Sequence, residues 1–265
     1  TWMTLPKIFG IYYEDKDKIV IFTQVGKVIA KGGKPALEMM EKQLLTFQYP
    51  NRTQEHFSQK MNDKFCIFPY RFLVKLLLNV KYLTVQEIEY FVLSVSSDKE
   101  LVSVTHKIGL FRKGKIKLDY ESHREKNKKD HEPELYKKYI NDLANTFKNH
   151  MEFLQGISSK RVGMLDQLFI ESGHEKKWIE LIKHLDSEWK FNDTYLDQDR
   201  KFFVDRYGRL PGKQKASSKT SKPVTKDQTK IRKIQNAIVK IMEESPTEIN
   251  RNEMIEKIHE LTYIS

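Results

Sequence analysis

The sequence is poor in the residues that build disulfide frameworks, and it has no long apolar runs. Cys66 is the single cysteine among 265 residues, so neither an internal disulfide nor a cysteine-based metal site is possible within this chain. No apolar run approaches the roughly 18 to 20 residues of a membrane span. The first residues also lack the charged and apolar regions of a secretory signal. We therefore expect a cytoplasmic protein in a reducing compartment, without a membrane partner.

Motifs of self-contained enzymes are missing as well. A nuclease of the PD-(D/E)xK type needs an Asp and, on the following strand, a Glu-x-Lys, because two carboxylates hold its divalent metal. The nearest approximations, at residues 14–16 and 125–128, do not follow an apolar strand beside a second Asp. The histidines do not pair at metal-ligand spacings, and no phosphate-binding Gly-rich loop or nucleophile elbow is present. We expect no catalytic residue, metal or cofactor in this chain, and no small-molecule substrate.

What the sequence does have is an excess of positive charge. Lys and Arg number 47 against 36 Asp and Glu, a net charge of +11, which favours an acidic partner such as a phosphate backbone. The excess lies in two segments: residues 107–138 carry 11 basic and 6 acidic side chains, and residues 209–233 carry 9 basic and 1 acidic. Basic connectors can also serve solubility alone, so charge does not decide between these interpretations.

Local signals predict the first elements. Strand-forming residues at 9–13 and 19–22 flank a polar turn and predict a β-hairpin. Thr23 can cap a following helix that ends at Gly32 and Gly33, and Pro35 opens the next helix, which runs to Pro50. Residues 51–66 show no period and predict a long exposed loop.

A pair of helices follows the loop. Pro69 opens the first, and Thr84 with Glu87 forms a capping box at the start of the second, which is expected to run to residue 95. Two helices joined by a few residues have the outline of a helix-turn-helix, although such pairs are more often ordinary packing units.

The second half begins after the basic segment at residues 107–133. Pro133 opens a long helix in which apolar residues recur every four positions, from Leu135 and Tyr139 to Met151, and Gly156 ends it. Residues 161–170 fit a strand or a short helix, and helices are expected at 175–189 and 196–208. Residues 209–229 are low in complexity and predict a flexible linker, and two terminal helices lie within 230–265.

Several of these segments match one family in order, spacing and hydrophobic detail. They are T-x-x-G-K-x-[IL] after a hairpin (Thr23 to Ile29), K-Q-L-[LV]-x-[FW]-Q-Y-P (Lys42 to Pro50), the helix start at Pro69, and L-T-x-x-E-[IL] with F-x-L (Leu83 to Leu93). In these segments the sequence resembles the AlwI family of type IIS restriction endonucleases. The resemblance is good to about residue 106 and weaker to 212.

The resemblance implies sequence-specific recognition of double-stranded DNA, within an enzyme that cuts or nicks at a fixed distance from an asymmetric site. It implies the recognition region only, with Mg²⁺ expected for a separate nuclease domain of the parent protein. Because the chain begins at Thr1 rather than a methionine and stops directly after a helical pattern, we expect that both ends were trimmed from something longer. Alternatives are a specificity or scaffold subunit that recruits a separate nuclease, and an enzyme with an unrecognised site.

The expected fold is mainly α with small β-hairpins (α+β), arranged as tandem winged-helix or helix-turn-helix-like subdomains. The predicted divisions are a winged-helix-like recognition subdomain at 1–106, a basic connector at 107–133, a second helical recognition subdomain at 134–208, a flexible basic linker at 209–229, and terminal helices at 230–265.

Two sets of residues are candidates for DNA contact. A basic cluster just after the helix pair is expected to bind phosphates, although it can also be a solvated charge run: Arg112, Lys113, Lys115 and Lys117. Base reading is expected from the exposed face of the Thr84 helix and from the long loop, where amide, carboxylate and guanidinium groups match base edges: Gln86, Glu89, Asn51, Arg52 and Gln54. The alternative for the second set is an ordinary polar surface.

Overall fold

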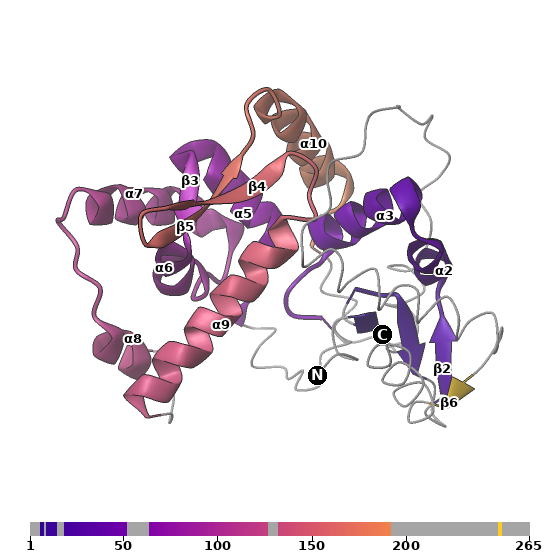
Figure 1. Ribbon diagram of the computed structural model, residues 1–265, viewed down its shortest axis with the longest axis horizontal. Helices are drawn as coiled ribbons and strands as arrows, with labels where there is room; N and C mark the ends of the chain where they lie inside the picture. Colours follow the sequence, from indigo (N-terminus) through magenta and orange to yellow (C-terminus); the bar gives the residue numbers. More distant parts are fainter. Residues whose placement is uncertain are drawn as a thin grey trace. The chain divides into compact units, whose positions relative to one another are not determined.

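The computed structural model describes residues 6–7, 9–14, 19–51, 64–126, 132–191 and 249–250. Contacts divide the chain into unit 1 (residues 1–43, 51–57 and 194–265) and unit 2 (residues 44–50 and 58–193). The described part is mostly helical with small antiparallel sheets, as expected for an α+β chain (Figure 1). None of its helices is long and apolar enough to cross a membrane. The predicted linker at 209–229 and the terminal helices at 230–265 lie outside the described residues, apart from residues 249–250.

Unit 1 contains a small sheet and two helices. The predicted hairpin is confirmed, with Tyr12 opposite Phe22 in an antiparallel pair. A third, two-residue strand pairs with the second strand of the hairpin. The elements are β1 (Tyr12–Glu14), β2 (Ile19–Phe22), α2 (Gln24–Lys31), α3 (Gly33–Thr46, which continues into unit 2) and β6 (Ile249–Asn250).

The start of α2 is fixed by Thr23 as predicted. The Thr23 hydroxyl oxygen accepts a hydrogen bond from the Gly26 amide at 3.0 Å, and the hydroxyl donates to the Gly10 carbonyl at 2.7 Å. Gly26 lies so close to the hairpin that an added Cβ would be 2.0 Å from the Ile11 carbonyl oxygen. A glycine is therefore needed here for the helix to pack against the hairpin.

Unit 2 is built from helices on a three-stranded sheet. Its elements, in chain order, are α5 (Pro69–Val80), β3 (Tyr82–Thr84), α6 (Val85–Glu87), the π-helical turn η1 (Ile88–Val92), the 3₁₀ turn η2 (Asp98–Glu100), α7 (Leu101–Arg112), α8 (Tyr120–Lys126), α9 (Pro133–Met151), β4 (Ile157–Val162), β5 (Leu165–Ile170) and α10 (Glu175–Glu188). The helix starts predicted at Pro69 and Pro133 and the capping box of Thr84 and Glu87 are confirmed.

The sheet of unit 2 has the strand order β3-β5-β4 and is antiparallel throughout. Tyr82 pairs with Phe169, so the sheet joins the helix pair to a hairpin far along the chain. Leu83, Ile157 and Leu168 are buried on the side that faces the core. Residues of the predicted subdomains 1–106 and 134–208 therefore share this sheet and a single contact unit.

Arg71 on α5 is a buried charged centre of unit 2. Its guanidinium donates to the Leu45 carbonyl at 3.1 Å, in the last turn of α3, and to the Trp189 carbonyl at 3.0 Å, just after α10. It also pairs with Asp186 at 3.2 Å and lies over the Phe68 ring. Carbonyls at helix C-termini have no partner within their own helix and attract positive charge. Arg71 therefore ties the ends of α3 and α10 to α5.

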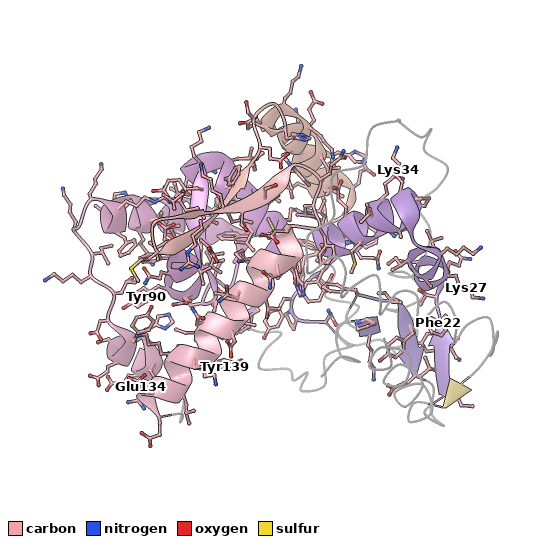
Figure 2. All side chains as sticks on the ribbon, in the orientation of Figure 1. Phe22, Lys27, Lys34, Tyr90, Glu134 and Tyr139 are labelled. Carbon is pink, nitrogen blue, oxygen red and sulfur yellow. The ribbon has the colours of Figure 1, made fainter. Side chains whose placement is uncertain are left out.

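Helices occupy part of the predicted basic connector at 107–133, because α7 runs to Arg112 and α8 occupies Tyr120–Lys126. The apolar repeat predicted in the long helix needs correction. In α9 the buried positions include Tyr136, Ile140 and Ala144, whereas Tyr139 is 47% exposed (Figure 2). An apolar repeat of four residues drifts around a helix of 3.6 residues per turn, so it does not mark one face over five turns.

Candidate nucleic-acid interface

The predicted recognition helix is short and its start is fixed by internal contacts. Glu87 is 1% exposed and bonds the backbone amide of Thr84 at 2.8 Å. Arg112 at the end of α7 donates to both oxygens of Glu87, at 2.7 and 3.0 Å. The same guanidinium donates to the carbonyls of Val80 and Tyr82 and lies 3.8 Å from the centre of the Tyr82 ring. Arg112 therefore clamps α7 to β3 and to the start of α6.

The predicted phosphate cluster thus divides into two kinds of side chain. The donors of Arg112 are used within unit 2, whereas Lys113, Lys115 and Lys117 are exposed in the segment that follows α7. Exposed ammonium groups can neutralise phosphates without losing an internal partner. The ammonium groups of the three lysines are therefore accessible from solvent.

The polar face of the Thr84 helix is covered by other helices. Glu89 is 2% exposed and accepts a hydrogen bond from the Tyr120 hydroxyl at 2.9 Å and another from the Asn141 amide. Burial and the adjacent Glu89 carboxylate raise the pKa of Tyr120, which keeps its hydroxyl a donor. Tyr90 stacks on His123 with ring centres 4.7 Å apart, and its hydroxyl donates to the Asp119 carbonyl. These contacts attach the helix to α8 and α9.

The other candidates for base reading are placed as follows. Gln86 is half-buried in the first turn of α6, and Asn51 is fully buried. Arg52 and Gln54 lie outside the described residues. The structure therefore brings Gln86 and Glu89 together on one short helix of unit 2, whereas Asn51 belongs to unit 1.

Sequence reasoning missed α7, which presents a long open face. Val104 and Ile108 are buried and the helix packs on α5, whereas Val102, Ser103, His106 and Lys107 are exposed. An added Cβ at Gly109 would meet nothing within 4 Å, so the backbone of the helix is open at this point. The signal that was available is the Ser97 and Glu100 capping box, which the structure contains.

The hairpin of β4 and β5 forms a second open surface. Pairs from Ile157 opposite Ile170 to Val162 opposite Leu165 hold the two strands in register, and the turn contains Gly163 at φ 61°. Figure 1 shows this turn at the end of the sheet away from α10. Lys160 and Arg161 are exposed along β4. The β4 strand therefore carries positive charge next to the turn.

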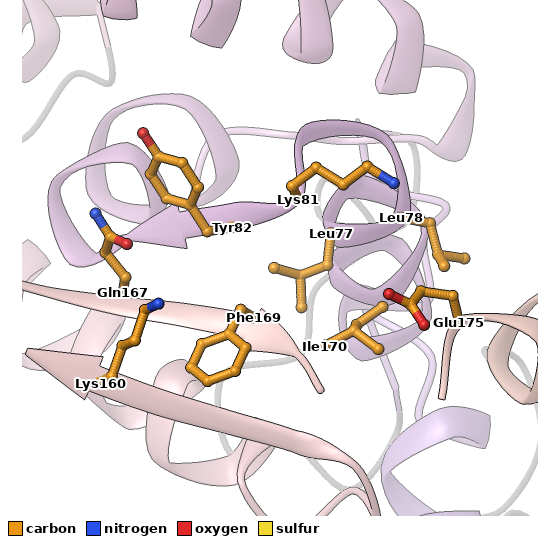
Figure 3. A pocket seen from close by; sticks show the side chains of 9 residues that line it. All are labelled: Leu77, Leu78, Lys81, Tyr82, Lys160, Gln167, Phe169, Ile170 and Glu175. Carbon is orange, nitrogen blue, oxygen red and sulfur yellow. The ribbon is translucent and has the colours of Figure 1, made fainter. Parts of the chain in front are cut away.

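A cavity of about 250 Å³ lies between the C-terminal end of α5 and this sheet (Figure 3). The ammonium of Lys160 is 5.1 Å from the centre of the Phe169 ring. The cavity combines two lysines with an aromatic and aliphatic floor, lined by Leu77, Leu78, Lys81, Tyr82, Lys160, Gln167, Phe169, Ile170 and Glu175. Among the described residues no group of three or more His, Cys, Asp or Glu side chains could hold a metal ion.

Comparison with known families decides the identity of the chain. The family model described as AlwI restriction endonuclease matches residues 8–203. The chain belongs to the AlwI restriction endonuclease family. The match spans all of the described helices and strands except β6. Among curated proteins, none matches the sequence. Membership of the AlwI family indicates a restriction-enzyme function and implies DNA as a partner.

Proposed function

We propose that this AlwI-family chain recognises a specific double-stranded DNA sequence through unit 2. In the proposal it is part of a type IIS enzyme that cuts or nicks at a fixed distance from an asymmetric site. Cleavage is assigned in this proposal to a nuclease domain or subunit that uses Mg²⁺, as the resemblance to the family implies. The observation that carries the proposal is the family match over residues 8–203, which spans all the described residues of unit 2. Unit 2 has an open helix, α7, and a basic hairpin of β4 and β5.

The order of elements supports a winged-helix arrangement. Helix α5 is followed by β3, by the α6 and η1 helix, by α7, and finally by the β4 and β5 hairpin, with α8 and α9 inserted before β4. The sheet order β3-β5-β4 brings the first strand beside the last. In this arrangement α7 is the second helix of a helix-turn-helix, the one that enters the major groove, and the hairpin is the wing.

The exposed face of α7 has the chemistry for this task. Ser103 and His106 can bond base edges, and Lys107 is placed for a phosphate on the same face. Lys113, Lys115 and Lys117 continue the positive charge beyond the end of the helix. Among the earlier candidates, Gln86 remains proposed as a base contact from α6, whereas the Glu89 carboxylate is covered by Tyr120 and Asn141.

The salt dependence of binding tests the phosphate contacts. A variant with Lys113, Lys115 and Lys117 all changed to Gln is expected to flatten the slope of log affinity against log salt by about 2.7, at roughly 0.9 for each phosphate contact. The effect should be the same on every duplex sequence, because phosphate contacts carry no sequence information. Fluorescence anisotropy with a labelled duplex measures the slope.

The control removes the same charge elsewhere in unit 2. Lys176, Lys183 and Lys190 are exposed on or just after α10, and changing all three to Gln alters the net charge equally. An equal slope in both triple variants would contradict the assignment. Selection of bound duplexes from a random-sequence pool tests the specificity itself, and a pool without enrichment of any sequence would refute sequence-specific recognition.

A further inference from the structure

The tip of the β4 and β5 hairpin concentrates apolar side chains in solvent. Val162, Met164 and Leu165 are 45%, 90% and 38% exposed. Single exposed apolar residues are ordinary on a protein surface, but a cluster of them marks a contact surface. Three within four residues, on either side of a glycine turn, form such a cluster, which we call the apolar tip.

The hairpin carries the apolar tip on a two-stranded arm that extends beyond β3. Thr84, the last residue of β3, pairs with Gln167, so the pairs from Arg161 opposite Asp166 onward extend past the third strand. Opposed residues of an antiparallel pair lie on the same face, which puts Val162 beside Leu165. Ile157 and Leu168 are buried and anchor the base of the arm in the core of unit 2.

Positive charge lies on the strand that leads into the apolar tip. Lys160 and Arg161 are exposed immediately before it, and the Asp166 carboxylate is paired with Lys148 at 3.3 Å. An apolar apex next to a basic strand is complementary to the duplex, where stacked bases lie beside rows of phosphates. Proteins that bind the minor groove insert Met, Leu and similar side chains between base steps and kink the DNA.

We propose that the apolar tip is a wedge that enters the base stack of duplex DNA from the minor groove. Met164 at the apex separates two neighbouring base pairs, while Lys160 and Arg161 hold phosphates beside the opened step. This inference rests on the proposed function and adds to it that recognition bends the DNA. Flexible pyrimidine–purine steps are the favoured place for the wedge, because they unstack at the lowest cost.

The experiment uses the full chain and the duplex that the wild-type chain selects from a random-sequence pool. One set of duplexes carries 2-aminopurine at each adenine in turn, whose fluorescence rises on unstacking, and another carries dyes at both ends to measure bending. Wild type is expected to raise the fluorescence at one step and to bend the duplex by about 20–90°. Met164→Gln keeps the length of the side chain and is expected to abolish both signals and to lower affinity about tenfold.

Two further variants make the result specific. Met164→Leu keeps an apolar apex and should retain the bend. Ile179→Gln replaces an apolar side chain that is 55% exposed on α10, and it should leave binding and bending unchanged. Thermal unfolding checks that each variant folds.

The outcomes separate this inference from the proposed function. If Met164→Gln binds and bends the duplex as wild type does, the wedge is refuted and DNA recognition stands. If that variant instead lowers the sedimenting mass of the chain while DNA binding is unchanged, the apolar tip is a contact between copies, which also refutes the wedge. If wild type binds no duplex at all, the proposed function itself fails.

Discussion

Gly109 lies inside α7, where glycine lowers the stability of the helix. Glycine in the interior of an exposed helix costs roughly 0.5–1 kcal/mol relative to alanine, because it loses more conformational freedom on folding. Inside α2, the nearby Ile11 carbonyl explains Gly26. At Gly109 nothing lies within 4 Å of the added Cβ. No contact within the described structure therefore accounts for the missing side chain.

The proposed role of α7 accounts for it, since a recognition helix must approach DNA closely. Gly109→Ala is expected to stabilise the chain by about 0.5–1 kcal/mol. The added methyl group would at the same time meet the DNA, and steric overpacking of a fitted surface costs typically 1–3 kcal/mol. The variant should therefore bind the selected duplex about 5- to 150-fold more weakly. A gain in stability together with a loss of affinity is a combination that a purely structural role does not produce.

Thermal unfolding and fluorescence anisotropy measure the two effects on the same protein. His184→Ala is the control, because His184 is exposed on α10 and alanine also has the higher helix propensity there. It should stabilise the chain slightly and leave the affinity unchanged. Wild-type affinity in Gly109→Ala would refute the close approach of α7 to DNA. A loss of stability would instead refute the open space at Gly109.

Two further predictions concern the core of unit 2. Arg71→Met is expected to destabilise unit 2 by about 3–5 kcal/mol in urea unfolding, because it leaves the helix-end carbonyls and Asp186 without the buried charge. Asp186→Asn should cost much less stability, since Asp186 is 41% exposed. Equal losses of stability in the two variants would contradict the role given to the carbonyls. Burial lowers the pKa of His150 to about 4. As the pH falls, the unfolded chain therefore binds a proton at this residue before the folded chain does. About 3 kcal/mol of stability that is present above pH 6.5 should be lost as the pH falls toward 4. His150→Gln should flatten this part of the profile of stability against pH, whereas His184→Gln should not. Equal profiles for wild type and His150→Gln would show that the pKa of His150 is not depressed.

Local signals in the sequence predict the helix starts well. The first backbone N–H groups of a helix have no partner within the helix. Thr23 and the pair of Thr84 and Glu87 supply hydrogen-bond partners at their helix starts, and Pro69 has no N–H group that needs one. These effects act within three or four residues. Such signals can be recognised from neighbouring residues alone, without knowledge of distant partners. The family resemblance around them, likewise carried by capping and apolar positions, is confirmed by the match over residues 8–203.

The parts that escaped prediction depend on distant partners. The three residues of β3 form a strand only because β5 pairs with them. Glu89 lies on the polar side of its helix, and nothing near it in the sequence indicates that Tyr120 and Asn141 cover it. The sequence pattern did not predict helix α7, because its two buried positions, Val104 and Ile108, are too few to form a clear apolar stripe. A surface position read from periodicity is therefore exposed only if no later segment packs on it.

The pairing of β3 with β5 also has a consequence for how the chain folds during synthesis. Tyr82 and Phe169 are separated by roughly 90 positions, which a ribosome adding about 5–20 residues per second takes several seconds to cover. During that interval β3 has no sheet partner, and both its backbone groups and the buried face at Leu83 are open to other chains. A fragment that ends between α7 and α9 would remain in this state permanently. For that reason a segment of unit 2 moved into another enzyme has to include both β3 and β5.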